Sequence, residues 1–150
     1  MRLISKTPAA IAQIRGTADN AGLSGMVRFY QFSGGVLVEV DVTGLPKNSS
    51  GFHGFHIHAG AACKGDDFSA TGGHFATVGK PHPLHAGDLP PLLSRNGRAY
   101  LTVLTDRFSI SDIVGRTVVV HADSDDFHTQ PAGNAGKKIA CGVIMRNSVR

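Results

Sequence analysis

Val36-Leu37-Val38-Glu39-Val40-Asp41-Val42 is the stretch of this chain that decides its fold class. The valines recur at alternate positions, and Glu39 and Asp41 fall between them, so an extended chain would have one apolar face and one acidic face. This pattern predicts a half-buried antiparallel strand. Gly34-Gly35 separates the stretch from a second β-rich run, residues 25–32, and the two runs together predict a hairpin.

Similar patterns recur along the chain, with turn residues between them. Asn96-Gly97, for example, predicts a tight turn between two such runs. Regular helix is expected only as a short turn within residues 109–114. We predict strands at residues 9–15, 25–32, 36–42, 52–58, 89–95, 98–105, 115–121 and 139–145. The sequence thus predicts an all-β protein with about eight antiparallel strands.

The bulk composition fits one domain over residues 1–150, since a chain of this length buries about two-thirds of its unfolded surface. The net charge is +4, but the basic residues are scattered, which favours an anionic small partner over nucleic acid. No apolar run is long enough to span a bilayer, so no membrane partner is expected. The N-terminus lacks a signal peptide, which predicts a cytoplasmic location, or an extracytoplasmic one if a signal peptide was removed.

Phe55-His56-Ile57-His58 is the most informative stretch for function, because His56 and His58 would point to the same side of a strand and could bind one metal ion. Two irregular segments, residues 59–88 and 122–137, break the strand pattern, and long loops in a compact domain are usually functional or disordered. Further candidate ligands lie in the first of these segments and at the end of a Val-rich run: His74, His82, His85, Asp88 and His121. Six histidines and an aspartate exceed the needs of one tetrahedral ion, which indicates two metal ions or one ion with an extended set of supporting groups.

Two further histidines are interpreted differently. His53 has the opposite strand parity from His56 and His58, which predicts a buried, hydrogen-bonded structural residue. His128 is expected to be a solvated loop residue.

Taken together, several segments resemble the copper/zinc superoxide dismutases, a standard example of β-sandwich architecture. The matching segments occur in the family's order and span nearly the whole chain: residues 51–58, 72–75, 85–89, 115–121, 133–136 and 140–144. The resemblance implies an eight-stranded antiparallel Greek-key β-barrel or sandwich with two long functional loops.

The resemblance also implies a ligand set for each metal. The copper ligands would be His56, His58, His74 and His121, and the zinc ligands would be His74, His82, His85 and Asp88. His74 would bridge both ions through its two ring nitrogens. Imidazoles suit copper, and three imidazoles with a carboxylate suit a tetrahedral zinc site. Asp125 matches the family's aspartate that links a copper ligand to a zinc ligand, here His56 and His82.

The chain departs from the familiar eukaryotic members of the family at two places near these ligands. Only two residues separate His82 from His85, so the zinc segment is compressed. Lys138 stands where the family has an arginine beside the substrate channel; lysine keeps the positive charge but lacks the planar fork that binds an anion through two hydrogen bonds.

The two cysteines, Cys63 and Cys141, could form one bridge or remain thiols, and free thiols are the usual state in an intracellular chain. The resemblance favours an intrasubunit disulfide between them. Such a bridge would tie the ligand-bearing loop to the barrel and stabilise the fold by about 4 kcal/mol in the chain-entropy model.

The function that the resemblance implies is disproportionation of superoxide to oxygen and hydrogen peroxide by Cu(II)/Cu(I) cycling, with His74 carrying a proton and Lys138 attracting the anionic substrate. An alternative hypothesis is a copper-buffering or copper-delivery protein with incidental dismutase activity. A third is a zinc-stabilised structural module. The complete copper set argues against both alternatives. Dimers are common in the family, so a homodimer is possible, but the sequence offers no apolar patch that selects a dimer surface.

Overall fold

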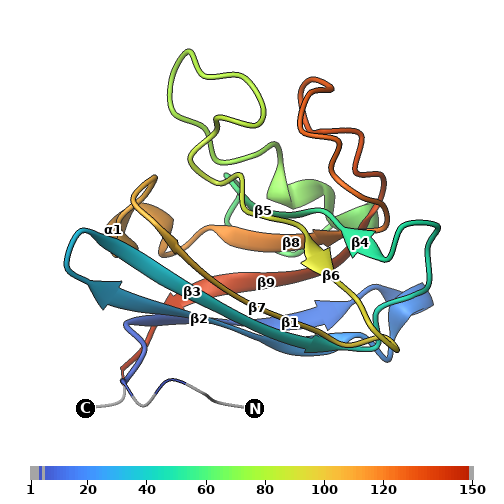
Figure 1. Cartoon of the computed structure of the whole chain (residues 1–150), viewed down its shortest axis with the longest axis horizontal. Coiled ribbons are helices and arrows are strands. Elements are labelled where there is room, and N and C mark those ends of the chain that lie inside the picture. Colours follow the sequence, from blue (N-terminus) through green and yellow to red (C-terminus); the bar gives the residue numbers. More distant parts are fainter. Residues whose placement is uncertain (1–3, 5, 149–150) are drawn as a thin grey trace.

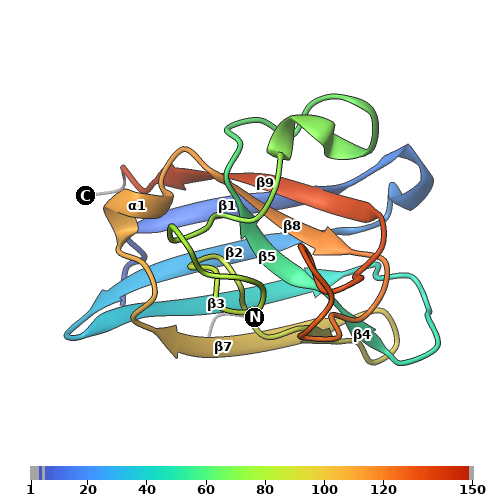
Figure 2. The same ribbon diagram turned by 90° about the horizontal axis from the view of Figure 1, so that it is seen from above.

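Seven strands form one curled antiparallel sheet in the computed structural model, which describes residue 4 and residues 6–148 (Figures 1 and 2). The order of strands in this sheet is β5-β8-β9-β1-β2-β3-β7, and β4 and β6 form a separate pair. The strands are β1 (Ala10–Gly16), β2 (Ser24–Phe32), β3 (Gly35–Thr43), β4 (Phe52–His53), β5 (Phe55–His58), β6 (Leu92–Leu93), β7 (Ala99–Thr105), β8 (Thr117–His121) and β9 (Lys138–Arg146). The all-β prediction is confirmed.

Helical structure in the described residues is limited to three short segments: 3-10 helices η1 (Ala18–Asn20) and η2 (Asp66–Thr71), and helix α1 (Ile110–Ile113). The short turn predicted near residues 109–114 is thus confirmed, and a capping box formed by Ser109 and Asp112 begins it. The two 3-10 helices were not predicted. None of the helices among the described residues has the length and apolar character needed to cross a membrane.

The strand predicted over residues 52–58 is divided at Gly54. Its first part, β4, pairs with β6, whereas its second part, β5, pairs with β8. A side chain at Gly54 would bring its Cβ within 2.7 Å of the Ala135 Cβ, so the glycine permits the loop that follows β8 to come close. The strand predicted over residues 89–95 is reduced to β6, in part because Pro90 and Pro91 have no backbone N–H for a ladder.

The alternate valines of β3 supply one wall of the core. Val36, Val38, Val40 and Val42 are at most 1% exposed, and burial of each stabilises the fold by about 1.5–3 kcal/mol. Val38 pairs with Phe29 of β2 and with Val103 of β7. The apolar residues of the central strands therefore form one contiguous core.

Glu39, on the opposite face of β3, is buried rather than solvated. The Tyr30 hydroxyl donates to its Oε1 at 3.1 Å, and the Tyr100 hydroxyl donates to its Oε2 at 2.7 Å. Arg28 Nη1 lies 3.6 Å from the same carboxylate, which compensates its charge. Burial, together with the hydrogen bond to Glu39, raises the pKa of Tyr100 to about 12.

The two long loops rise from the same side of the sheet, above β5 and β8 (Figure 1), and the view from above places them beside each other (Figure 2). The first loop joins β5 to β6, and the second joins β8 to β9. A disulfide between Cys63 and Cys141, with Cα atoms 5.8 Å apart, ties the first loop to β9. The predicted bridge is thus confirmed.

Candidate metal centre

The first loop is laid along β5 by backbone pairing. Phe75 N–H donates to Ile57 O at 2.8 Å, and Ile57 N–H donates to Gly87 O at 2.9 Å. Gly87 lies so close to β5 that a Cβ there would approach Ile57 O to 2.3 Å, and only glycine fits. This pairing brings His74 opposite His58 and Asp88 opposite His56.

The four predicted copper ligands converge above β5 and β8. His56 and His58 project from the same side of β5, as their spacing predicts. His121 ends β8 at a register shift that follows Val120, and such an irregularity re-aims a side chain. Its Nε2 lies 3.3 Å from Nε2 of His58. One nitrogen from each of His56, His58, His74 and His121 lies within 4.8 Å of the others.

The four predicted zinc ligands converge beside the first set, around the carboxylate of Asp88. Asp88 Oδ1 lies 2.7 Å from His74 Nδ1, and Oδ2 lies 3.1 Å from Nδ1 of both His82 and His85. All four donor atoms lie within 4.8 Å of one another. His74 belongs to both sets: its Nδ1 contacts Asp88, and its Nε2 makes no hydrogen bond.

Four buried ring nitrogens in these sets make no hydrogen bond: Nδ1 of His56, His82 and His85, and Nε2 of His74. The 3.1 Å contacts of His82 and His85 with Asp88 lack hydrogen-bond geometry. A buried polar atom without a partner is costly, so such atoms call for an explanation. A cation in each set would satisfy all four. Three imidazoles with one carboxylate suit zinc, and four imidazoles suit copper, so the residues present fit both metals.

The remaining ring nitrogens orient these donors. His58 Nδ1 donates to Gly72 O at 2.8 Å, and His121 Nδ1 donates to Gly136 O at 3.1 Å, so Nε2 of each ring is left for the copper set. Burial lowers the pKa of His58 to about 2 and that of His121 to about 3. Both rings are therefore neutral at neutral pH, which is the state that ligates a metal.

Asp125 joins the two sets. Its Oδ2 lies 2.7 Å from His56 Nε2 and its Oδ1 lies 2.8 Å from His82 Nε2, so one carboxylate holds a predicted copper ligand and a predicted zinc ligand. Burial raises the pKa of Asp125, but the hydrogen bonds from His56 and His82 outweigh burial and hold it below its usual range. At Gly133, whose φ is +73°, a Cβ would lie 2.0 Å from Asp125 Oδ1. A larger residue there would displace the carboxylate.

Lys138, at the start of β9, is the predicted cation beside the copper set. Its Nζ donates to Thr71 Oγ1 at 2.8 Å and to Gly72 O at 3.0 Å. The Gly72 carbonyl thus accepts from both Lys138 and His58. No role was assigned to Thr71 or Gly72 from the sequence, although Gly72 begins one of the segments that carry the family resemblance.

The other two histidines lie where the sequence predicts. His53 is buried, and its Nδ1 lies 2.8 Å from His121 O, so it supports the turn that presents His121. The side chain of His128 is 80% exposed. Sequence reasoning missed two polar residues that contact the zinc segment, Arg107 and Gln130, because each lies far along the chain from that segment.

The fold and the two adjoining donor sets define an all-β protein with a histidine-rich centre for two metal ions. Comparison with known proteins identifies its family. Residues 23–144 match the model of the family named Copper/zinc superoxide dismutase (SODC). The chain therefore belongs to the copper/zinc superoxide dismutase family.

Individual relatives agree with this placement. The protein is 36% identical over 135 residues to Superoxide dismutase [Cu-Zn] 2 of Aquifex aeolicus, an alignment that covers 80% of this chain and 78% of the relative. It is 39% identical over 127 residues to Superoxide dismutase [Cu-Zn] of Legionella pneumophila, which covers 80% and 76% of the two chains. Its fold matches a crystal structure of a double mutant of a SOD-like protein from Bacillus subtilis with a TM-score of 0.78 at 28% identity, over 90% of this chain and 96% of that one.

Proposed function

We propose that this protein is an enzyme that converts two superoxide anions and two protons to oxygen and hydrogen peroxide, with copper and zinc as cofactors. The observation that carries this proposal is the position of His74 in both donor sets. Its Nδ1 lies 2.7 Å from the Asp88 carboxylate, whereas its Nε2 is buried without a protein partner beside the copper set. A single imidazole placed in this way would link the two metal sites.

The two donor sets would have separate tasks. His56, His58, His74 and His121 would hold copper, and His74, His82, His85 and Asp88 would hold zinc. Bound copper would supply the one-electron chemistry that oxidises one superoxide anion and reduces a second, and the zinc set would hold the shared residue His74 in place. Asp125 orients the rings of His56 and His82, one through each of its carboxylate oxygens.

His74 is also the residue best placed to deliver a proton. The reaction consumes two protons, and His74 Nε2 is a buried acceptor that no protein group occupies. Whenever Nε2 is not serving as a metal ligand it could hold one proton, which it would pass to the peroxide. The second proton would come from solvent, and Nε2 would then be free again. Because Nδ1 faces the zinc set, the ring keeps its position during this exchange.

Copper buffering or delivery is the rival function, and the geometry gives it no support. A delivery site needs only copper ligands that release the ion readily. Here the copper set is complete and shares His74 with a second set. Both features favour a resident metal pair.

Controlled metal loading tests the enzyme assignment. Metal-free protein loaded with copper and zinc should accelerate the decay of superoxide in a stopped-flow assay, and protein loaded with zinc alone should leave the decay at the rate of the buffer. Metal analysis of the same samples establishes their content. Protein that holds both metals yet leaves the decay at the buffer rate would refute the assignment.

The ammonium of Lys138 should attract the anionic substrate. Thr71 Oγ1 and Gly72 O hold it at the edge of the copper set, and electrostatic steering of this kind raises association rates by 10-fold or more. We expect Lys138→Ala to lower kcat/KM about tenfold and to reduce its dependence on ionic strength, because salt screens the attraction. Lys138→Arg should retain both.

Lys47→Ala is the matched control, since Lys47 is an exposed lysine in the loop before β4. Its kcat/KM and salt dependence should equal those of the wild type. A Lys138→Ala protein whose kcat/KM falls with salt as steeply as that of the wild type would contradict a steering role for Lys138.

A further inference from the structure

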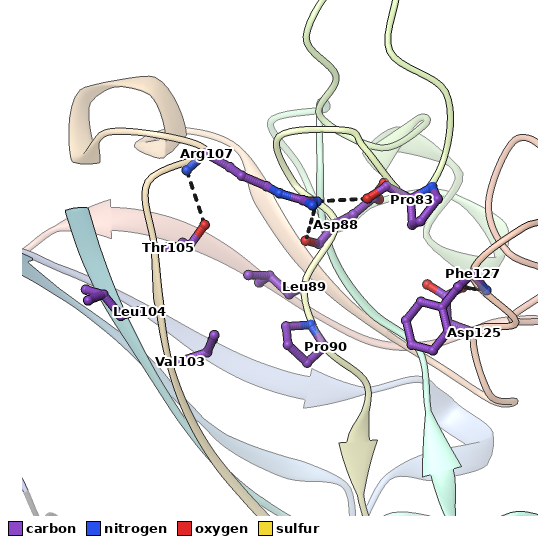
Figure 3. Close-up of a pocket in the computed structure, with 10 residues that line it drawn as sticks. All are labelled: Pro83, Asp88, Leu89, Pro90, Val103, Leu104, Thr105, Arg107, Asp125 and Phe127. Atoms are coloured by element: carbon purple, nitrogen blue, oxygen red, sulfur yellow. Dashed lines mark hydrogen bonds between the residues drawn. The ribbon is translucent and has the colours of Figure 1, made fainter. Parts of the chain in front are cut away.

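The compressed segment from His82 to Asp88, called the zinc loop below, lies above a cavity. The cavity has a volume of about 450 Å³ and lies between the zinc loop and β7 (Figure 3). Pro83 and Asp88 line it from the loop side, Val103 and Thr105 from β7, and Phe127 from the second long loop. This part of the zinc loop therefore does not gain its position by packing against β7.

The zinc loop offers few large apolar side chains for packing. Leu84 is 51% exposed, Ala86 is buried but small, and the other residues between the ligands are Pro83 and Gly87. Three of the four zinc donors nevertheless lie in this short loop: His82, His85 and Asp88. A metal site needs its donors held within about half an ångström, so other contacts must fix the backbone.

Arg107 supplies contacts of this kind from the turn after β7. Its side chain extends across the cavity to the backbone of the zinc loop (Figure 3). Nη1 donates to Pro83 O at 2.8 Å and makes longer contacts to His85 O at 3.3 Å and Asp88 O at 3.4 Å. A guanidinium is always charged, and here three carbonyl dipoles converge on it. Two of these carbonyls belong to zinc donors.

Gln130 supplies contacts from the second long loop. Its Oε1 accepts from the His82 N–H at 3.0 Å, and its Nε2 donates to His82 O at 2.6 Å. The side-chain amide thus pairs with both backbone groups of His82, as a neighbouring strand would. The His82 ring is held separately, by Asp125.

We propose that Arg107 and Gln130 are positioning residues for the zinc donor set, and that together they slow the release of zinc. Gln130 fixes the beginning of the zinc loop at His82. Arg107 holds the carbonyls of Pro83, His85 and Asp88 from across the cavity, and these contacts add to the backbone pairing of Gly87 with Ile57 and Phe75. This inference rests on the proposed function to the extent that the second donor set holds zinc.

Metal-transfer rates test the inference. The variants Arg107→Ala and Gln130→Ala, loaded with one equivalent of zinc and no copper, are mixed with an excess of the chromogenic chelator 4-(2-pyridylazo)resorcinol. We expect zinc to transfer about tenfold faster from each variant than from the wild type, because loss of groups that orient metal ligands costs 10-fold to 100-fold in metal affinity. In copper- and zinc-loaded protein reduced with ascorbate, transfer of Cu(I) to bicinchoninate should stay within about twofold of the wild type, since neither residue contacts a copper-only ligand.

Two conservative variants and two controls sharpen the test. Arg107→Lys keeps the charge but presents a single ammonium, so its zinc release should be intermediate. Gln130→Glu keeps the acceptor for the His82 N–H but loses the donor to the His82 carbonyl, so it should release zinc as Gln130→Ala does. Arg15→Ala and Gln13→Ala, at exposed positions of β1, should behave as the wild type.

Cobalt(II) placed in the zinc set gives a second readout that a general loss of stability would not produce. Its visible absorption bands report ligand geometry, and they should change in Arg107→Ala and Gln130→Ala but not in the two controls. If one alanine variant folds poorly, the cobalt spectrum can be recorded on the conservative variant at the same position, Arg107→Lys or Gln130→Glu.

Three results would overturn the inference. Zinc release from both alanine variants at the control rate would exclude the positioning role. Equal acceleration of copper and zinc release would show a general loosening. Wild-type protein that binds no zinc would contradict the zinc assignment itself. Metal analysis of the wild type before the chelator is added separates this outcome from the first one.

Discussion

Alanine in place of His58 should abolish superoxide removal, with a loss of at least about a hundredfold in the rate of the metal-loaded protein. Substitution of a residue that only supports a ligand costs up to that factor, and a ligand itself costs more. His58 is buried, and the hydrogen bond from its Nδ1 to Gly72 O leaves Nε2 facing His121. No neighbouring side chain can take the place of this donor once it is removed.

The metal content of His58→Ala makes the result specific. His58 belongs to the copper set alone, so the variant should lose copper while it keeps zinc. His128→Ala is the matched control, because the His128 side chain is 80% exposed and lies outside both sets. If His58→Ala kept copper and removed superoxide within a factor of about two of the wild type, the copper assignment would be wrong.

Loss of the disulfide should have the largest effect on stability. Cys63 and Cys141 are 78 positions apart, and closing a loop of that length is worth about 4 kcal/mol of unfolding free energy in the chain-entropy model. We expect the Cys63→Ser, Cys141→Ser double variant to approach this loss. Its Tm should fall by roughly 10 °C for a chain of this size.

Denaturant unfolding of the metal-free proteins measures the disulfide contribution without interference from metal release. Wild-type protein in the presence of a thiol reductant should unfold at the same denaturant concentration as the double variant, since both lack the bridge. A double variant that unfolds within about 1 kcal/mol of the oxidised wild type would show that the bridge contributes little to stability.

The sheet could be predicted because its signals are local. Alternation within residues 36–42 reflects which side chains of a pleated chain reach the core, and the structure buries all four valines. The break at Gly54 could not be predicted in this way. It depends on the close approach of Ala135, a residue more than eighty positions away. The burial of Glu39 likewise depends on Tyr30 and Tyr100, which neighbouring strands bring over it.

In the candidate site, too, local features could be predicted and features that depend on tertiary contacts could not. Strand parity alone placed His56 and His58 on one side of β5. The division of the ligands into two sets, and the role of Asp125, came from the resemblance to a known family. The contacts of Thr71, Arg107 and Gln130 follow from the path of two long loops, and loop paths are set by tertiary contacts that leave no periodic pattern in the sequence.

The carbonyl oxygen of Gly72 accepts one hydrogen bond from His58 and another from Lys138. A carbonyl oxygen has two lone pairs, so both of its places are taken. The charge proposed to attract the substrate and the imidazole proposed to bind copper thus share one acceptor atom. A substitution that moves this atom should therefore disturb both side chains at once, so substrate attraction and metal binding are expected to change together.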